Sequence, residues 1–303
     1  MFVNWYSRVI TQISSISYFT AFRGNTFILN NIPGPGTGSI DGTIYFWEHY
    51  TSNLTHTLED YEGGYAAYNL TGGVSTVIPD GISGNGSSSK TPGRYIPVGQ
   101  GFFVTASPTG GTVTFNNGQR SFVRESIGNS VFMDPYNPNV DDVRNAQSDS
   151  NSEEDIPRIR IEFTSEDELT RPLLIGFTPD NAATDGFDFG YDALFSDQFA
   201  NDMFWLIDDE KYIIQGVGAF DNTKQYPLGL FLSNSGNIQI SLTDIENFDT
   251  DIDVYIYDAV LDIYTSINVE NYQIYLNADD YTSRFYLAFS ADPLNIGEFT
   301  DNK

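Results

Sequence analysis

The run RIRIEF (158–163) alternates charged and apolar residues without a break. This period of two is expected of a β-strand that turns one face to a core and the other to solvent. Short alternating or aromatic runs bounded by Gly, Asn, Asp or Pro continue as far as residue 289. They are PLLIGF (172–177), MFWLID (203–208), KYIIQG (211–216), YPLGLFL (226–232), NIQISL (237–242), DVYIYD (253–258), YQIYL (272–276) and RFYLAF (284–289).

The first half of the chain shows the same pattern. Its runs are GTIYFWEHY (42–50), GGYAAYNL (63–70), GQGFFVTA (99–106) and GGTVTFNN (110–117). Patterns with the period of a helix are nearly absent, and a single short helix is expected, around 191–201. The sequence therefore predicts an all-β fold of two tandem β-sandwich, jelly-roll-like domains.

Two polar stretches divide the chain. PDGISGNGSSSKTPG (79–93) is rich in Gly and Ser and is predicted to be a surface loop. DPYNPNVDDVRNAQSDSNSEED (134–155) has too few large apolar residues to order itself and is predicted to be a linker. The predicted organisation is a first β-sandwich domain (1–134), an acidic linker (135–155), a second, acidic β-sandwich domain (156–293) and a tail (294–303).

The chain has a formal net charge of −27, and 25 acids against 6 bases lie within 156–293. This charge repels nucleic acid and anionic membranes and suits divalent cations or basic partners. The absence of cysteine excludes disulfides, thiol catalysis and cysteine-ligated metals. No apolar run approaches the ~18–20 residues of a membrane helix. Neither nucleic-acid binding nor membrane insertion is expected.

The two histidines, His49 and His56, limit catalysis and metal binding. A tight hairpin between them would place their rings opposite each other, where Glu48 or Glu59 could complete a zinc or copper site. The alternative is a polar cross-strand pair. The chain has no Gly-x-Ser-x-Gly elbow and no P-loop, and with 41 acids a pair of hydrolytic carboxylates is uninformative. No catalytic residue is assigned, and the chain is predicted not to be an enzyme.

The segment TDGFDFGYDA (184–193) is a candidate calcium site, with carboxylates at Asp185, Asp188 and Asp192. Calcium takes six to eight oxygens from carboxylates and carbonyls in flexible turns. The alternative is a shaped turn whose carboxylates accept hydrogen bonds from amides and whose aromatic residues anchor it on the sandwich.

A second candidate calcium site lies in NFDTDIDVYIYD (247–258), at Asp249, Asp251 and Asp253. In an extended strand these alternate side chains share one face, where like charges repel unless a cation or solvent separates them. The alternative is a solvated acidic face. Calcium is the cofactor that the sequence suggests.

Aromatic residues in YFWEHY (45–50) and DYEGGYAAY (60–68) allow a sugar-binding interpretation. Trp47, Tyr61 and Tyr65 would form a flat platform for sugar rings. The alternative is that such rings fill the core. The core of the first domain is predicted to include Trp47, Phe102, Phe103 and Phe115.

Several of these motifs resemble a known pair of modules. GTIYFWEHY, YAAYNLTGG, YIPVGQGFFV and GTVTFNNGQR resemble, in that order, a module of large secreted proteins from Bacteroidetes-type bacteria. TDGFDFGYDA, KYIIQG, FDNTKQYPLGL and YTSRFYLAF are similar to the module that follows it. The resemblance covers about 25–293. In such proteins the pair usually precedes a C-terminal sorting domain for the type IX secretion system.

The chain departs from this pattern at both ends. Residues 1–24 contain no proline, where such proteins usually have Gly-Asn-Pro-Tyr-Pro. LNIGEFTDNK (294–303) is similar to the lead-in of the sorting domain, which does not follow. The N-terminal run MFVNWYSRVITQ shows no basic region followed by an apolar one, so it is not expected to be a signal peptide. The chain is therefore expected to be a piece of a longer exported protein, outside the cell or on its outer surface.

The leading functional hypothesis is a non-enzymatic secreted module, namely a stalk, adhesin or assembly segment of that longer protein. Its expected partners are cell-surface or extracellular proteins, possible polysaccharide ligands, and the secretion machinery through the missing sorting domain. The alternative is a carbohydrate-binding module that uses exposed aromatic residues. A hydrolase working through two carboxylates is a third hypothesis, and a cleft with facing carboxylates would favour it.

Overall fold

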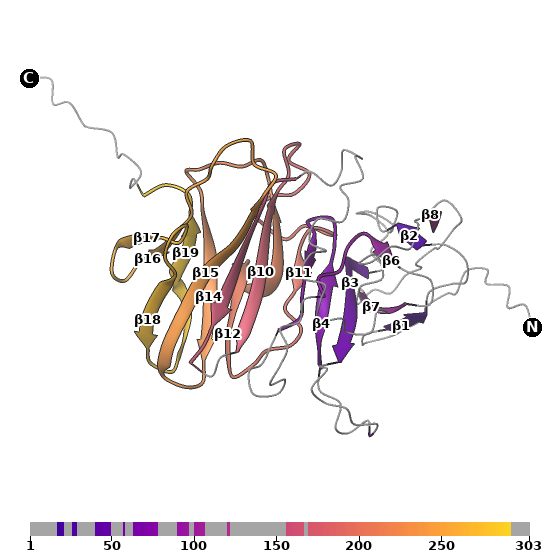
Figure 1. Cartoon of the computed structure of the whole chain (residues 1–303), viewed down its shortest axis with the longest axis horizontal. Coiled ribbons are helices and arrows are strands. Elements are labelled where there is room, and N and C mark those ends of the chain that lie inside the picture. The colour runs from indigo at the N-terminus through magenta and orange to yellow at the C-terminus, as the bar shows by residue number, and fades with distance from the viewer. Residues whose placement is uncertain are drawn as a thin grey trace, which may run out of the picture.

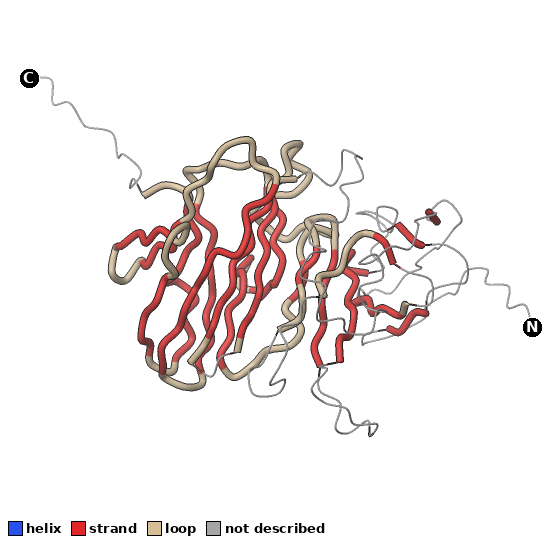
Figure 2. Tube along the Cα trace, viewed as in Figure 1, coloured by secondary structure: helices blue, strands red, loops and turns tan. Residues whose placement is uncertain are grey.

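The computed structural model describes residues 17–20, 26–28, 40–49, 57, 63–77, 90–96, 100–106, 120–121, 156–166 and 169–291. All regular structure in these residues is β-strand, as Figure 2 shows, and the all-β, β-sandwich-like prediction is confirmed. Within the same residues there is no helix that could cross a membrane. The predicted linker (135–155) and tail (294–303) lie outside the described residues, so the domain boundaries stay predictions.

The prediction of a short helix around 191–201 is wrong. This segment contains β11 (Ala193–Leu194) and a loop that leads into β12. Ala193 and Leu194 pair with Ile214 and Tyr212 of the neighbouring strand. The backbone groups of β11 therefore form their hydrogen bonds with β13, an interior strand of the sheet, and not within a helix.

Eight strands are described in the first half, and they form a five-stranded sheet in the order β1-β7-β3-β4-β5 and a three-stranded sheet in the order β6-β2-β8. They are β1 (Ser17–Thr20), β2 (Thr26–Ile28), β3 (Ile40–His49), β4 (Gly63–Tyr68), β5 (Gly73–Val74), β6 (Tyr95–Ile96), β7 (Gly101–Ala106) and β8 (Arg120–Ser121).

The described part of the second half forms one sheet in the order β17-β16-β19-β14-β12-β13-β10-β9-β15-β18, with β11 paired to β13. Its strands are β9 (Arg158–Thr164), β10 (Thr170–Phe177), β11, β12 (Asn201–Ile207), β13 (Glu210–Val217), β14 (Gln225–Leu232), β15 (Gly236–Glu246), β16 (Tyr255–Asp258), β17 (Ile263–Ser266), β18 (Tyr272–Leu276) and β19 (Asp279–Ala288). Among these strands, β10 and β13 pair in parallel and the other pairs are antiparallel.

This sheet rolls until its two ends meet. The Tyr272 hydroxyl on β18, at one end, donates to Asp258 Oδ2 on β16, near the other end, at 3.0 Å. The Arg284 guanidinium on β19 donates to the same carboxylate, with Nη2 2.7 Å from Oδ2. Asp258 has no exposed surface. We call these three residues the roll closure.

The five-stranded sheet packs against the rolled sheet (Figure 1). Strand β3 is buried on both faces along Thr43–Phe46, which explains its nearly unbroken apolar run. Ile44 and Phe46 belong to a small core of the first half. Tyr45 belongs to the large core of the rolled sheet, together with Ala67 and Val74 of the first half. The large core therefore includes side chains from both halves.

Candidate functional site

The segment TDGFDFGYDA follows β10, ends at the first residue of β11 and touches both halves of the molecule. Phe187 stacks on Tyr212 of the rolled sheet, with ring centroids 5.9 Å apart. Phe189 instead packs against the small core of the first half. We call the contacts of this loop and of β9, β10 and β13 with the first half the seam.

Each of the three aspartates of the loop has its own partners. Asp188 Oδ2 accepts hydrogen bonds from the amide and the hydroxyl of Thr184. Asp192 Oδ2 accepts from the Asp188 amide, and its Oδ1 accepts from the Gly216 amide at 2.8 Å. Asp185 forms an exposed ion pair with Lys224. Asp188 and Asp192 thus act as the amide-capping groups of a shaped turn.

Backbone hydrogen bonds join the loop to the first half. The Gly190 carbonyl accepts from the Leu70 amide at 2.8 Å, and the Gly190 amide donates to the Asp41 carbonyl at 3.1 Å. A Cβ at Gly42 would lie 2.6 Å from the Gly190 Cα, and both glycines have positive φ. These two glycines therefore permit a backbone contact that larger residues would block.

Thr71 packs against two glycines of the rolled sheet, Gly176 and Gly216, which we call the glycine floor. Gly176 on β10 and Gly216 on β13 are paired in register. A Cβ at Gly176 would lie 2.5 Å from Thr71 Cγ2, and one at Gly216 would lie 2.7 Å from Thr71 Oγ1. The Thr71 hydroxyl donates to the Tyr191 carbonyl at 2.6 Å, and the residue is fully buried. Thr71 of the first half thus occupies the space that these two glycines leave open on the rolled sheet.

Two arginines of β9 extend the seam. Arg158 Nε donates to the Thr71 carbonyl at 2.6 Å, and Arg160 Nη1 donates to the Gly73 carbonyl at 2.6 Å. Both guanidinium groups also pair with Glu246 on β15. The two arginines of the run RIRIEF therefore bind the backbone of the first half and do not point freely into solvent.

One family model covers the seam and the sheets on either side of it. It is described as a domain of unknown function, DUF8693, and it matches residues 14–289. The chain belongs to the DUF8693 family. Neither a curated protein nor a solved structure matches it. The single DUF8693 match runs through both halves, including the segment predicted to be a linker.

Two carboxyl groups at the seam have raised pKa values. Burial raises the pKa of Asp192 to about 7, although the amides of Asp188 and Gly216 act in the opposite direction. Burial likewise raises the pKa of Asp41 to about 6, against hydrogen bonds from the Thr43 amide and the Tyr45 hydroxyl. Because the pKa values of these groups in the folded chain lie above the ordinary value, their ionisation near neutral pH weakens the seam.

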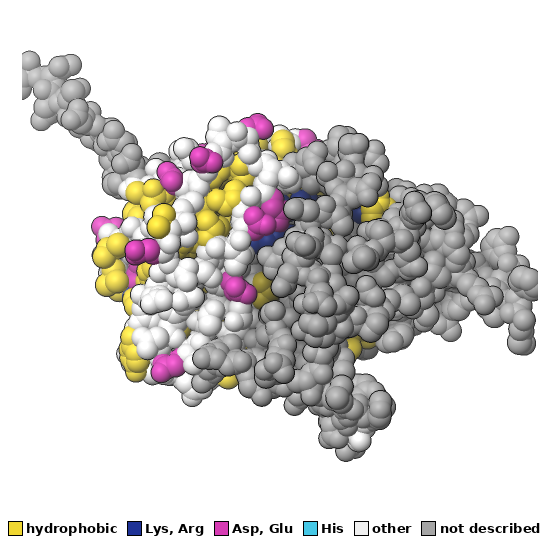
Figure 3. Space-filling view, in the orientation of Figure 1, with side chains coloured by type: hydrophobic (Ala, Val, Ile, Leu, Met, Phe, Trp, Pro, Cys, Tyr) yellow, Lys and Arg dark blue, Asp and Glu magenta, His cyan; other side chains and the backbone are white. Residues whose placement is uncertain are grey.

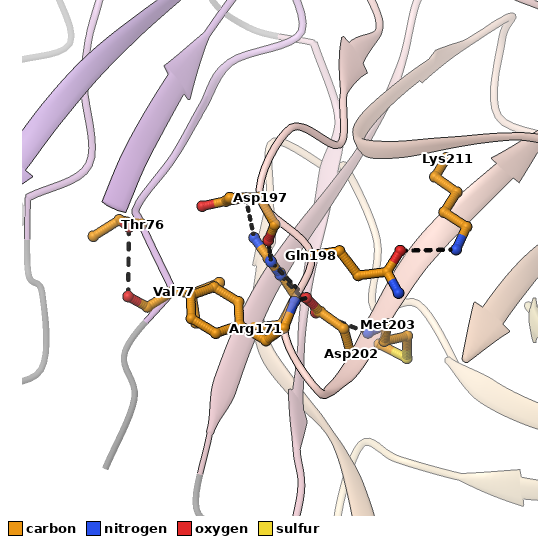
Figure 4. Close-up of polar contacts among 9 residues, drawn as sticks. Thr76, Val77, Arg171, Asp197, Gln198, Asp202, Met203 and Lys211 are labelled. Carbon is orange, nitrogen blue, oxygen red and sulfur yellow. Dashed lines mark hydrogen bonds and ion pairs between the residues drawn. The ribbon is translucent and has the colours of Figure 1, made fainter. Parts of the chain in front are cut away.

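A buried arginine lies on the rolled sheet near the first half. Figure 4 shows Arg171 between Asp197 and Asp202. Its guanidinium donates to both Asp202 oxygens, at 2.8 and 2.7 Å, and to Asp197 Oδ1 at 3.1 Å. Burial raises the pKa of Asp197, and Arg171 opposes that shift. The Asp197 charge also raises the pKa of Tyr65 in the first half, after the larger effect of burial.

The predicted sugar platform is only partly described, and its geometry is not flat. Tyr61 lies outside the described residues. The rings of Trp47 and Tyr65 are 5.0 Å apart but meet edge to face at 67°. Tyr65 and Phe103 meet at 86°, and both pack against the large core. These rings therefore do not form the coplanar row that a sugar platform requires.

The predicted core of the first half needs one correction. Phe102 is buried, as predicted, and Phe103 is half-buried. Trp47 is 37% exposed, so the prediction of a core position is wrong. Trp47 lies near the end of β3. Successive side chains of a strand point to opposite faces, so Trp47 points away from the face on which Phe46 and Glu48 are buried. Phe115 lies outside the described residues.

The second predicted calcium segment is not a strand along its aspartates. Asp249, Asp251 and Asp253 are exposed in the loop between β15 and β16, so the expected shared strand face is wrong. In the described ranges, no group of three or more His, Asp or Glu residues is placed to hold a metal ion. The side chain of His49 and all of His56 lie outside those ranges. The calcium and histidine-metal hypotheses stay predictions.

Sequence reasoning missed Thr71, the Gly176–Gly216 floor and the roll closure. The glycines stand inside the runs PLLIGF and KYIIQG, where a glycine in a strand is a signal of close backbone approach. No comparable signal marks Thr71 as their partner, because the contact joins segments about a hundred residues apart in the chain.

Proposed function

We propose that this chain is a non-enzymatic structural module of a longer exported protein, acting as a stalk, adhesin or assembly segment at the outer cell surface. Its partners would be cell-surface or extracellular proteins, and the secretion machinery through a sorting domain elsewhere in the longer protein. Type IX export rests on the resemblance of the motifs.

The observation that carries the proposal is the seam. Backbone bonds at Gly190, the Thr71 side chain on its glycine floor, and the contacts of Arg158 and Arg160 hold the two halves in one orientation. Relative motion of two domains is expected unless their interface is large and apolar, and here the large core includes apolar side chains of both halves. A seam of interlocked backbone resists relative motion, as a segment that transmits force or spacing requires.

The buried ionisable groups fit this role better than catalysis. The carboxyl groups of Asp41, Asp192 and Asp197 have raised pKa values, which are typical of functional sites. Asp41 and Asp192 accept hydrogen bonds from amides, and Asp197 accepts from Arg171. Their partners are structural groups of the seam and of its neighbourhood, which favours a structural role for these acids.

The first test is whether the halves stay together after the chain is cut. Limited proteolysis is expected to cleave first within 135–155, because that segment has the composition of a linker. The two fragments should then elute together in size-exclusion chromatography at physiological salt. Separate elution would contradict a rigid seam, and early cleavage throughout 170–290 would contradict a stably folded rolled sheet.

The second test is location. Antibodies against 156–293 should label intact cells that produce the parent protein, and external protease should remove the signal without lysis. Labelling that requires lysis would overturn the proposed surface role. This result is independent of the co-elution test, so the rigid seam and the surface location are judged separately.

A further inference from the structure

Strand β17 lies at one end of the rolled sheet and has a free edge. Among the described strands it pairs only with β16. A free edge presents unpaired N–H and C=O groups to other chains, and many proteins block it with Lys, Pro or a bulge. The sequence of β17, IYTS, contains neither Lys nor Pro, and its register with β16 has no shift. Although it is only four residues long, this edge is therefore open to pairing.

The pairing with β16 shows which backbone groups of β17 are free. The Ile267 amide, one residue beyond the strand, donates to the carbonyl of Val254, directly opposite on the β16 side. Because hydrogen-bonded and non-hydrogen-bonded pairs alternate along an antiparallel ladder, every second residue before Ile267 also bonds to β16. Tyr264 and Ser266 lie at the positions between, so their amides and carbonyls point to the free edge.

Strand β17 projects beyond the roll closure. Ile263 lies directly opposite Asp258, so the two side chains share one face of the hairpin. Asp258 is fully buried and bonded to Tyr272 and Arg284, whereas Ile263 is 51% exposed. The roll therefore closes over β16 and leaves β17 outside. Figure 1 shows both strands at the end of the molecule away from the first half.

Exposed apolar side chains border the free edge at both ends. Val260 and Leu261, in the turn that leads into β17, are 69% and 51% exposed, and Val269, beyond the other end of the strand, is 90% exposed. Figure 3 shows apolar side chains gathered where Figure 1 places β16 and β17. Exposed apolar surface marks interaction sites on soluble proteins. Together with the free backbone groups, it provides what an added strand requires.

Side-chain contacts hold the hairpin in place. The Gln225 amide on β14 donates to the Tyr264 hydroxyl at 2.8 Å. The rings of Tyr264 and Tyr257 stack with their centroids 4.4 Å apart, and the Tyr257 hydroxyl donates to Asp262 at 3.0 Å. An edge that is ordered before binding loses little conformational entropy when a partner arrives.

The charge around the hairpin indicates the kind of partner. No Lys or Arg occurs between Lys224 and Arg284. Asp262 at the tip of the hairpin, and Asp253 and Glu270 near its other end, are exposed. A second copy of the chain would bring acids against acids at this edge, whereas a basic strand would complement them. The charge therefore favours a basic partner over a second copy.

We propose that β17 binds an extended segment of a partner protein in which alternating apolar residues are flanked by Lys or Arg. The added strand would bond to the backbone of Tyr264 and Ser266 and place apolar side chains beside Ile263. Its basic ends would lie near Asp262 and Glu270. This inference rests on the proposed role as an assembly segment and names the class of partner for it. Surface labelling of cells involves no peptide, so the two proposals can fail separately.

The test is binding of the full 303-residue chain to an array of peptides of about ten residues, the length of a long strand. The peptides alternate Val, Ile or Thr with Ser between flanking Lys pairs. Matched peptides carry Glu pairs in place of Lys, or a central Pro. At least one Lys-flanked peptide should bind. Its Glu-flanked and Pro-containing forms should not, because the acids repel the former and the latter lacks a ladder amide.

Ser266→Pro removes an edge amide that does not bond to β16, a position where a strand tolerates proline. It should weaken peptide binding about tenfold or more, through lost hydrogen bonds and the bulk of the ring. Ser266→Ala keeps the amide and should bind as the wild type does. Circular dichroism and thermal melts of the two variants should agree, which shows that the fold is intact. If Ser266→Pro does not fold, Glu270→Lys replaces it with the same expected loss, and Glu210→Lys on β13 is its control.

Failure of every Lys-flanked peptide to bind would overturn the proposal, as would equal binding by Ser266→Pro and Ser266→Ala. Equal binding of Glu-flanked peptides would overturn the basic character of the partner. Sedimentation velocity of the chain alone tests the other occupant, and a monomer is expected. Self-association that disappears in Ser266→Pro would assign the edge to a second copy instead.

Discussion

Two buried aspartates close this molecule in different ways. Asp258, in the roll closure, accepts hydrogen bonds from Arg284 and Tyr272. Asp192, in the seam, accepts hydrogen bonds from the amides of Asp188 and Gly216, and no described cation pairs with it. Burial alone would raise both pKa values. Arg284 and Tyr272 reverse that effect and lower the pKa of Asp258, whereas the pKa of Asp192 rises to about 7.

The difference predicts opposite responses to pH. A carboxyl group with a lowered pKa contributes stability above its ordinary pKa and loses it as the pH falls through the folded value. A carboxyl group with a raised pKa binds its proton more tightly in the folded state, so its contribution falls as the pH rises. Acid should therefore weaken the roll closure and strengthen the seam.

The largest expected effect is at the roll closure. Arg284→Met leaves the buried Asp258 carboxylate without its cation and should lower the free energy of unfolding by about 3–5 kcal/mol at pH 7. Arg284→Lys keeps the charge and should lose less. Urea unfolding followed by tryptophan fluorescence measures both variants. A loss below about 1 kcal/mol in Arg284→Met would show that the cation is dispensable there.

The pH dependence of the seam should be the next largest effect. The pKa of Asp192 is about 7 in the folded chain against 3.8 ordinarily, so its contribution should fall between about pH 4 and pH 7. The full shift corresponds to at most about 4 kcal/mol. Asp192→Asn removes one acceptor and should destabilise the chain at pH 4, but its difference from the wild type should shrink toward pH 7. Unfolding curves across this range measure it.

The exposed Asp209→Asn is the control for this series and should leave the pH profile unchanged. A constant difference between Asp192→Asn and the wild type from pH 4 to pH 7 would contradict the raised pKa.

The glycine floor should give a smaller effect. Gly176→Ala places a Cβ against the Thr71 methyl and should cost about 1–3 kcal/mol through overpacking. Thr71→Ser removes that methyl, so the same alanine should cost less in the Thr71→Ser background. Gly93→Ala, where no atom lies within 4 Å of the added Cβ, is the control. A double-mutant cycle with no coupling would show that Thr71 does not occupy the floor.

The smallest expected effect concerns calcium. The carboxylates of Asp185, Asp188 and Asp192 already serve Lys224, Thr184 and the amides of the seam. Thermal melts of the full chain in millimolar calcium and in chelator should therefore agree within about 1 °C. A rise of several degrees that disappears in Asp188→Ala would place an ion in this loop and restore the calcium hypothesis.

The sequence alone allows the strands of the second half to be predicted well. Runs such as RIRIEF and YQIYL alternate with the period of two of a strand and are bounded by turn-forming residues. The structure has strands β9 and β18 at these runs. The cross-strand pair of Tyr257 on β16 and Tyr264 on β17 also had a signal, since the two residues stand symmetrically about the turn at Val260–Leu261. Two tyrosines so placed are expected to face each other in a hairpin.

Tertiary structure alone decided the role of the segment TDGFDFGYDA. Its composition is equally suited to a calcium loop and to a capped turn, because both use carboxylates and glycines. Which partner each aspartate takes depends on residues far away in the chain, namely Gly216 for Asp192 and Lys224 for Asp185. The contacts of Thr71 likewise depend on distant residues, namely Gly176 and Gly216. Local sequence determines backbone periodicity, whereas the partner of a buried polar group is determined by which distant segment packs against it.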